Sequence, residues 1–163
     1  MRVELRLDEH DSAFPAPQAM TAFAALHKSV FPETPAAAVR DRLLARPRFL
    51  FQLAWLGPDL AGYKVGFEEA PERFHSWLGA VAPALRRQGV ASALMRAQHA
   101  WCRAHGYRYV TTNTTNRWPD MLVLDIRHGF AVIGTYTDAH GETKILLAKA
   151  LDPAGSRGEG APT

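Results

Sequence analysis

The segment Arg-Arg-Gln-Gly-Val-Ala at residues 86–91 constrains the fold of this chain more than any other part of the sequence. An apolar run at residues 77–81 precedes it, and residues 90–105 follow with the spacing of an amphipathic helix. The first N–H groups of a helix have no partner inside the helix and carry the positive end of its dipole, so this arrangement creates a site for an anion. Gly89 lets the backbone approach such a ligand closely. The segment therefore predicts a phosphate-binding loop.

This loop is distinct from two common nucleotide-binding motifs. It lacks the Gly-Lys-Ser/Thr ending of a P-loop, and no Gly-x-Gly-x-x-Gly follows an early strand. The rest of the composition is that of one globular domain: 163 residues, 47% hydrophobic, with a net charge of +3 at pH 7. This mild basic balance suits an anionic ligand, but without a dense group of lysines and arginines it does not indicate nucleic acid binding.

Cysteine usage and hydropathy predict the compartment. A single cysteine, Cys102, excludes a disulfide within the chain and indicates a reducing environment. No apolar run approaches the roughly 20 residues of a membrane span. We therefore expect a cytoplasmic protein that does not bind membranes.

Hydrophobic periodicity predicts the order β-α-α-β-β-β-α-β-α-β-β, a mixed α/β layer fold in one domain. The predicted strands span residues 2–7, 49–56, 60–67, 74–81, 107–112, 130–136 and 143–151, and the predicted helices span residues 18–30, 36–45, 90–105 and 119–128. Thr34 is the expected cap of the second helix, with Pro35 at its first position. Residues 8–17 and 68–72 are predicted loops. We assign the domain to residues 1–151 and predict that residues 152–163 are disordered.

Two sequence motifs within this order of strands and helices resemble those of a known superfamily. The form Arg-x-x-Gly-x-Ala at residues 86–91 is similar to the Q/R-x-x-G-x-G/A motif of the GNAT acetyltransferases, in which it binds the pyrophosphate of acetyl-CoA. Asn116, Met121-Leu122 and Gly129-Phe130 resemble the N…ML…GF pattern of the ribosomal-protein acetyltransferase and mycothiol synthase-like branch. The resemblance covers residues 1–151 and implies a GNAT fold, in which the fourth and fifth strands splay apart around the pantetheine arm of the cofactor.

The same resemblance implies acetyl-CoA as co-substrate and indicates which residues hold it. The expected cofactor-binding residues are Gly79, Ala80, Val81, Arg86, Arg87, Gln88, Gly89, Val90, Ala91, Ser92 and Asn116. We expect no metal, because the seven histidines lack metal-binding spacing and one cysteine cannot form a zinc cluster.

Acetylation of an amine requires a base, because an ammonium must lose its proton before nitrogen attacks a thioester. Histidine has the ordinary pKa closest to working pH, and His75 lies at the offset from Val81 where several GNAT enzymes place a Glu or His. Strand periodicity predicts that His75 shares a face with Trp77, Gly79 and Val81. The alternatives, on the preceding predicted loop, are Glu68, Glu69 and Glu72.

Asp125 departs from the superfamily pattern. Many GNAT enzymes have a Tyr four residues before the helix-ending glycine, where it donates a proton to the leaving thiolate, and here that position is Asp125. An ionised Asp cannot donate a proton. Asp125 is thus a candidate catalytic residue whose alternatives are polar packing or a substrate contact, with water or Tyr136 as other proton donors.

These patterns predict an N-acetyltransferase that moves an acetyl group from acetyl-CoA to a primary amine by direct attack in a ternary complex. The acceptor is expected to be a small-molecule or peptide amine, bound beside the helices of residues 18–45, and the sequence leaves a homodimer open. One alternative is a module that binds acyl-CoA with little or no catalysis. Another is a partner-binding domain that uses the tryptophans Trp55, Trp77, Trp101 and Trp118.

Overall fold

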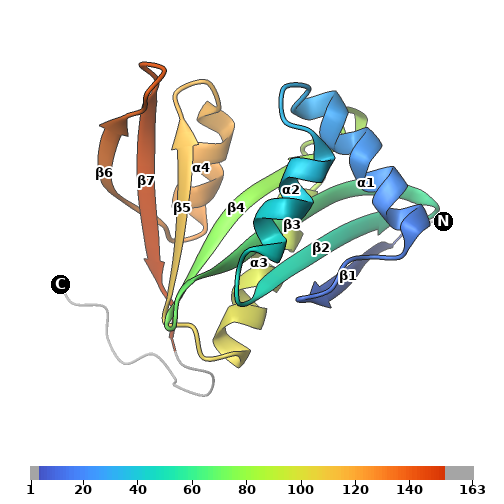
Figure 1. The fold of residues 1–163 in the computed structure, drawn as a ribbon, viewed down its shortest axis with the longest axis horizontal. Coiled ribbons are helices and arrows are strands. Elements are labelled where there is room, and N and C mark those ends of the chain that lie inside the picture. The colour runs from blue at the N-terminus through green and yellow to red at the C-terminus, as the bar shows by residue number, and fades with distance from the viewer. Residues whose placement is uncertain (1–3, 153–163) are drawn as a thin grey trace.

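The computed structural model describes residues 4–152 and confirms the predicted α/β GNAT fold (Figure 1). Its elements are β1 (Leu5–Asp11), α1 (Pro17–Val30), α2 (Ala36–Leu44), β2 (Phe49–Leu56), β3 (Asp59–Ala70), β4 (Arg73–Val81), the 3-10 turn η1 (Pro83–Leu85), α3 (Val90–Ala104), β5 (Tyr109–Thr115), α4 (Pro119–Arg127), β6 (Ala131–Thr137) and β7 (Thr143–Ala150). The tail predicted at residues 152–163 lies, beyond Asp152, outside the described residues.

The seven strands form one mixed sheet in the order β1-β2-β3-β4-β5-β7-β6. All neighbours are antiparallel except β4 and β5, which are parallel and pair only from Arg73↔Tyr109 to Ser76↔Thr112. Beyond that point the two strands diverge, as Figure 1 shows. The predicted splay is therefore present, and it leaves residues 77–81 of β4 without a partner strand on the β5 side.

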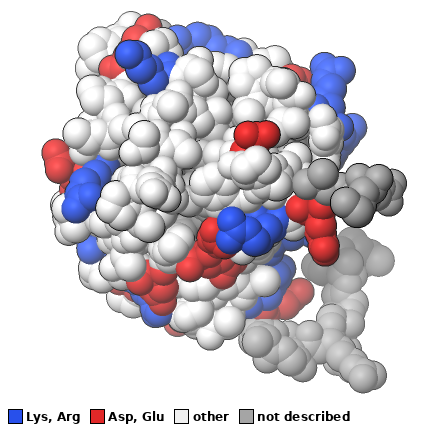
Figure 2. Space-filling view, turned by 90° about the vertical axis from the view of Figure 1, so that its right-hand side faces the viewer, with Lys and Arg blue, Asp and Glu red and all other residues white. Residues whose placement is uncertain are grey.

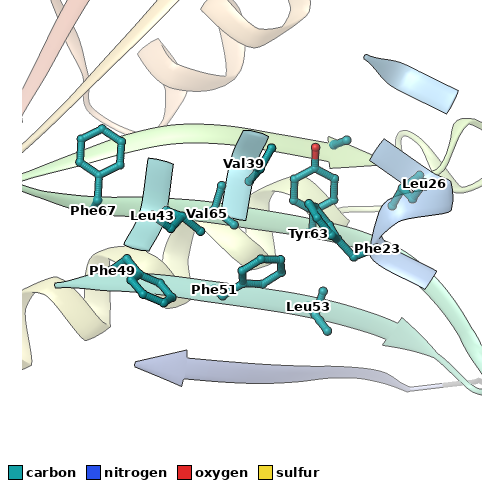
Figure 3. Packing of buried hydrophobic residues seen from close by; sticks show 11 residues of the cluster. Phe23, Leu26, Val39, Leu43, Phe49, Phe51, Leu53, Tyr63, Val65 and Phe67 are labelled. Atoms are coloured by element: carbon teal, nitrogen blue, oxygen red, sulfur yellow. The ribbon is translucent and has the colours of Figure 1, made fainter. Parts of the chain in front are cut away.

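The helices cover both faces of the sheet. On one face, Phe23 of α1 and Leu43 of α2 pack in a cluster with Phe51 and Tyr63 from the strands (Figure 3). Phe23 meets the rings of Phe51 and Tyr63 edge to face, at centroid distances of 4.9 and 4.7 Å. On the other face, Leu94 of α3 packs against alanines of β2 and β3. Helices α1 and α3 therefore lie against β4 on opposite faces of the sheet.

The first residues of two predicted loops are strand in the structure. β1 continues to Asp11, which pairs with Leu50, and β3 continues to Ala70, which pairs with Arg73. Charged residues have low β-propensity, but antiparallel pairing with a neighbouring strand satisfies their backbone groups and overrides that preference.

Helix ends follow local sequence signals with one exception. Gly106 and Gly129 have φ of +84° and +92° just after α3 and α4, as predicted for C-terminal glycines. The predicted cap Thr34 is wrong: Pro35 is the N-cap of α2, with an extended backbone. Thr34 instead offers its carbonyl oxygen to Nε2 of the buried His27, 2.6 Å away.

Lysines, arginines and acidic residues are intermixed on the face shown in Figure 2, between broad areas without charge. No helix within residues 4–152 is long and apolar enough to cross a membrane.

Candidate functional site

The loop before α3 has the backbone geometry of an anion site. Arg87 and Gly89 both have positive φ, +63° and +83°, and Gly89 is the N-cap of α3. The first hydrogen bond of the helix runs from Ala93 N–H to Gly89 O, 3.0 Å. The amides of residues 90–92 therefore have no hydrogen-bond acceptor inside the helix and are available to an anion. A Cβ placed on Gly89 would meet nothing within 4 Å, so this side of the loop is open.

A narrow groove lies between α3, α4 and the free edge of β4. It has a volume of about 50 Å³, and its lining is mostly apolar. The lining residues are Tyr63, Lys64, Gly79, Ala80, Val81, Ala91, Leu94, Met121 and Leu124. The structure thus brings four of the predicted cofactor-binding residues into one groove, at positions 79–81 and 91.

The other predicted cofactor-binding residues lie around that groove in different ways. The exposed loop at its end carries Arg86, Arg87, Gln88 and Gly89, and Arg86 Nε donates to Val81 O at 3.4 Å. The side chain of Val90 is buried in the core, so only its amide is available. The hydroxyl of Ser92 lies 3.0 Å from Nε2 of His128. Asn116 is exposed in the turn between β5 and α4 and lines neither this groove nor the cavity described next.

A second cavity, of about 280 Å³, lies on the α1/α2 face of the sheet. It spans the divergence of β4 and β5, and residues from α2, β6 and β7 complete its wall. The lining residues are Arg42, His75, Trp77, Asn113, Thr114, Thr115, Tyr136 and Lys144. The cavity, at His75 and Trp77, and the groove, at residues 79–81, therefore reach adjacent parts of β4 from opposite faces of the sheet.

A β-bulge at Trp77 changes which residues of β4 face each side of the sheet. Val65 pairs with Leu78 and Gly66 pairs with Ser76, so Trp77 is an extra residue on β4. His75 lies opposite Phe67 and shares the α1/α2 face with Trp77, as predicted. The prediction that Gly79 and Val81 share this face is wrong, because the extra residue reverses the alternation.

His75 is held by a chain of hydrogen bonds. Its Nδ1 lies 2.9 Å from Thr111 Oγ1, and the Thr111 hydroxyl donates to Glu69 Oε2 at 3.0 Å. Since the hydroxyl proton is directed to the carboxylate, the hydroxyl oxygen accepts from His75, which therefore carries its proton on Nδ1. Nε2 is left with a free lone pair.

The protonation state of His75 follows from its surroundings. The side chain is 8% exposed, and burial lowers its pKa to about 4. Glu69 opposes this shift, whereas the charges of Arg42, Arg46 and Arg73 add to it. The imidazole is therefore neutral at pH 7 and can accept a proton.

Asp125 and Lys64 are both buried, and the charge of each influences the pKa of the other. Asp125 is 3% exposed, and within residues 4–152 its Oδ2 has no hydrogen-bond partner. Burial raises its pKa to about 6 against the charge of Lys64, while burial lowers the pKa of Lys64. No ion pair joins the two among the described residues, and Asp125 lines neither the groove nor the cavity. This placement favours the polar-packing interpretation of Asp125.

Lys64, Arg42 and Thr111 are site residues that the sequence reasoning missed. Lys64 had a usable signal, since it is the one charged residue in the apolar run of residues 60–67. Arg42 and Thr111 had none, because an Arg on a short helix and a Thr in a strand are ordinary residues. No group of three or more potential metal ligands occurs within residues 4–152.

Asp125→Asn is expected to stabilise the protein at pH 7. A carboxyl whose pKa is about 6 when folded and 3.8 when unfolded binds more protons in the folded state, so stability falls as pH rises from about 4 to 6. Asparagine cannot ionise, and we expect the free energy of unfolding at pH 7 to rise by about 1–3 kcal/mol. Urea unfolding at pH 4 and pH 7 measures this, with the exposed Asp41→Asn as control. Equal gains at both pH values would contradict the burial of an ionised carboxylate.

The splayed strands, the free edge of β4 and the anion site at the start of α3 together define a fold of the CoA-dependent acyltransferase class. Residues 14–118 match the acetyltransferase (GNAT) family, and the chain belongs to this family. No curated protein matches the sequence.

Solved structures with the same fold include several acetyltransferases of low sequence identity. Ard1 from Thermoplasma volcanium is 18% identical, with a TM-score of 0.76 over 90% of this chain and 97% of that one. The aminoglycoside 6'-N-acetyltransferase from Enterococcus faecium is 14% identical, with a TM-score of 0.76 over 91% and 98%. The ribosomal-protein-S18-alanine N-acetyltransferase from Escherichia coli is 15% identical, with a TM-score of 0.71 over 93% and 99%.

Proposed function

We propose that the protein transfers an acetyl group from acetyl-CoA to a primary amine of a small-molecule or peptide acceptor, by direct attack in a ternary complex. The observation that carries this proposal is that the cavity and the groove reach adjacent parts of β4, residues 75–77 and 79–81, from opposite faces of the sheet. Two substrates that enter from opposite faces can then be bound at the same time. The N…ML…GF pattern supports a place in the ribosomal-protein acetyltransferase and mycothiol synthase-like branch.

The chain offers two sets of backbone groups to acetyl-CoA. The amides of residues 90–92 and the charges of Arg86 and Arg87 suit a pyrophosphate. The unpaired edge of β4 suits the amides of a pantetheine arm, which hydrogen-bond as an added strand does. The bound co-substrate supplies an activated acetyl thioester.

His75 is the proposed base. Its Nε2 lone pair is available at pH 7, and Thr111 and Glu69 hold the ring in the required tautomer. The three alternative bases all have other partners: Glu69 binds Thr111 and Arg73, Glu68 accepts from the Tyr107 hydroxyl, and Glu72 lies 3.9 Å from Arg108. Glu69 is thus a positioning residue that acts through Thr111.

The proton for the leaving thiolate has a different proposed source. We place the acceptor in the cavity of about 280 Å³ and call it the acceptor cavity. Asp125 lines neither this cavity nor the groove, whereas Tyr136 lines the acceptor cavity and its hydroxyl can donate. Water is the alternative donor, since CoA thiolate is a tolerable leaving group.

A turnover assay against a panel of primary amines, beside a direct titration of CoA, tests the proposed function. Acetylation of at least one amine together with saturable CoA binding is the expected result. CoA binding without acetylation of any amine would favour the alternative of an acyl-CoA-binding module, and absence of CoA binding would contradict both.

Arg86→Ala is expected to weaken CoA binding by about 1.5–3 kcal/mol, the range for a hydrogen bond to a charged group. The side chain is exposed, so the fold should be unaffected. Calorimetric titration at two salt concentrations measures the loss, and the wild-type affinity should fall as salt rises. Arg108→Ala, an exposed arginine beyond the other end of α3, is the control. Wild-type affinity and salt dependence in Arg86→Ala would place Arg86 outside the cofactor site.

A further inference from the structure

The acceptor cavity has an unbalanced set of charges. Its charged lining residues are Arg42 and Lys144, and within residues 4–152 no Asp or Glu lines it. Lys144 is already paired, with Glu142 Oε1 at 3.0 Å and Asp138 Oδ2 at 3.7 Å. In the described part of the chain, no carboxylate lies within 4.0 Å of the Arg42 guanidinium. Arg42 is therefore the positive charge of the cavity that the protein leaves uncompensated.

Aromatic rings hold Arg42 in place without using its donors. Its guanidinium carbon lies 4.8 Å from the ring centroid of Trp77 and 5.6 Å from that of Phe67. A guanidinium stacked on a ring uses its face, so the N–H groups in its plane remain free to bind a carboxylate through two parallel hydrogen bonds. Trp77 lies two residues beyond His75 on β4, so strand alternation places the ring under Arg42 on the same face as His75.

The positive charge lies in the same cavity as the proposed base. His75 and Arg42 both line it, and the charge of Arg42 is one of the causes that lower the pKa of His75. Arg46, one turn further along the chain, lies 4.1 Å over Phe67 and adds to the positive potential, but it does not line the cavity. A polycationic acceptor would be repelled here, whereas an anionic group would be attracted.

We propose, on the basis of the proposed function, that the acceptor is a primary amine that also carries a carboxylate, such as a free amino acid. The carboxylate binds the Arg42 guanidinium, and the amine lies at His75. Strand alternation places Trp77, on which Arg42 lies, and His75 on one face of the sheet, and the bulge turns Gly79 and Val81 to the other face.

The first test compares amino acids with the corresponding amino acid amides as acceptors. We expect the wild type to acetylate the acids with a kcat/KM about 10-fold to 100-fold higher, the range for one charge-assisted hydrogen-bonded contact. Arg42→Gln should remove this preference, so that kcat/KM for the acids falls to about that for the amides. The control is Arg46→Gln, which removes the neighbouring charge outside the cavity and should retain most of the preference.

The second test measures binding without turnover. N-acetylamino acids and their neutral amides are titrated into the CoA-bound protein by calorimetry, with wild type, Arg42→Gln and Arg42→Lys. Tighter binding of the acids that depends on Arg42 supports the proposal, even if no amine is acetylated, in which case the proposed catalysis fails alone. Acetylation of amines with no preference for the acids, or no binding of the acids at all, would overturn the carboxylate proposal and leave the proposed transferase function to its own test.

Discussion

His75→Ala is expected to lower kcat by a factor of about 10²–10⁴, the usual contribution of a positioned base, and to leave CoA affinity nearly unchanged. The ring accepts a proton at Nε2 because Thr111 and Glu69 keep the other proton on Nδ1. Without the ring, the described cavity lining holds no other histidine and no carboxylate that could accept the proton.

The pH dependence distinguishes this role from a structural one. With a pKa of about 4, the base of the free enzyme should produce an acid limb of kcat/KM near pH 4 rather than near 6.5. That limb should be absent in His75→Ala. The exposed His140→Ala is the control, and it should retain the wild-type rate and profile. A His75→Ala enzyme with the full rate and an unchanged profile would show that the base is another group or a water.

Gly89→Asp is expected to reduce CoA affinity by more than about 100-fold, because it places a carboxylate at the amides that are proposed to bind phosphate. The fold should survive, since a Cβ at this position meets no atom within 4 Å. The positive φ of +83° costs a side chain about 1–2 kcal/mol, and Asp and Asn tolerate this conformation better than most residues.

Gly89→Asn is the matched control for this substitution. It has the same shape and the same backbone cost as Asp but no charge, so most of the CoA affinity should remain. Calorimetric titration of both variants, after circular dichroism has shown that they are folded, separates charge from backbone effects. Equal affinity in wild type and a folded Gly89→Asp would refute the phosphate-binding assignment of the loop.

The features predicted best from sequence are those that local signals determine. The bounds of β2 and the ends of α3 and α4 follow from hydrophobic runs and from glycines that accept positive φ, as Gly106 and Gly129 do. The backbone geometry of the proposed phosphate-binding loop is local as well, because its amides and its glycine are consecutive. A short stretch of chain therefore contains all the information that these parts of the fold and of the site require.

The features that were missed depend on partners distant in sequence. The bulge at Trp77 arises from the register between β3 and β4, which no alternation within β4 reveals. The hydrogen bonds that hold His75 join residues 36 and 42 positions apart. Arg42 became a site residue only because α2 lies over the ring of Trp77.

The extra residue on β4 reverses, from Leu78 onward, which side chains face each side of the sheet. Up to Trp77 the alternation places His75 on the α1/α2 face, where the acceptor is proposed to bind, and after Trp77 it places Gly79, opposite Lys64, on the face proposed for the cofactor. Loss of a single residue at this point would exchange the destinations of every side chain from Leu78 to Val81 without changing any of them. The proposed separation of the two substrates thus depends on the number of residues in the strand, and a sequence comparison that considers substitutions but not insertions or deletions would overlook it.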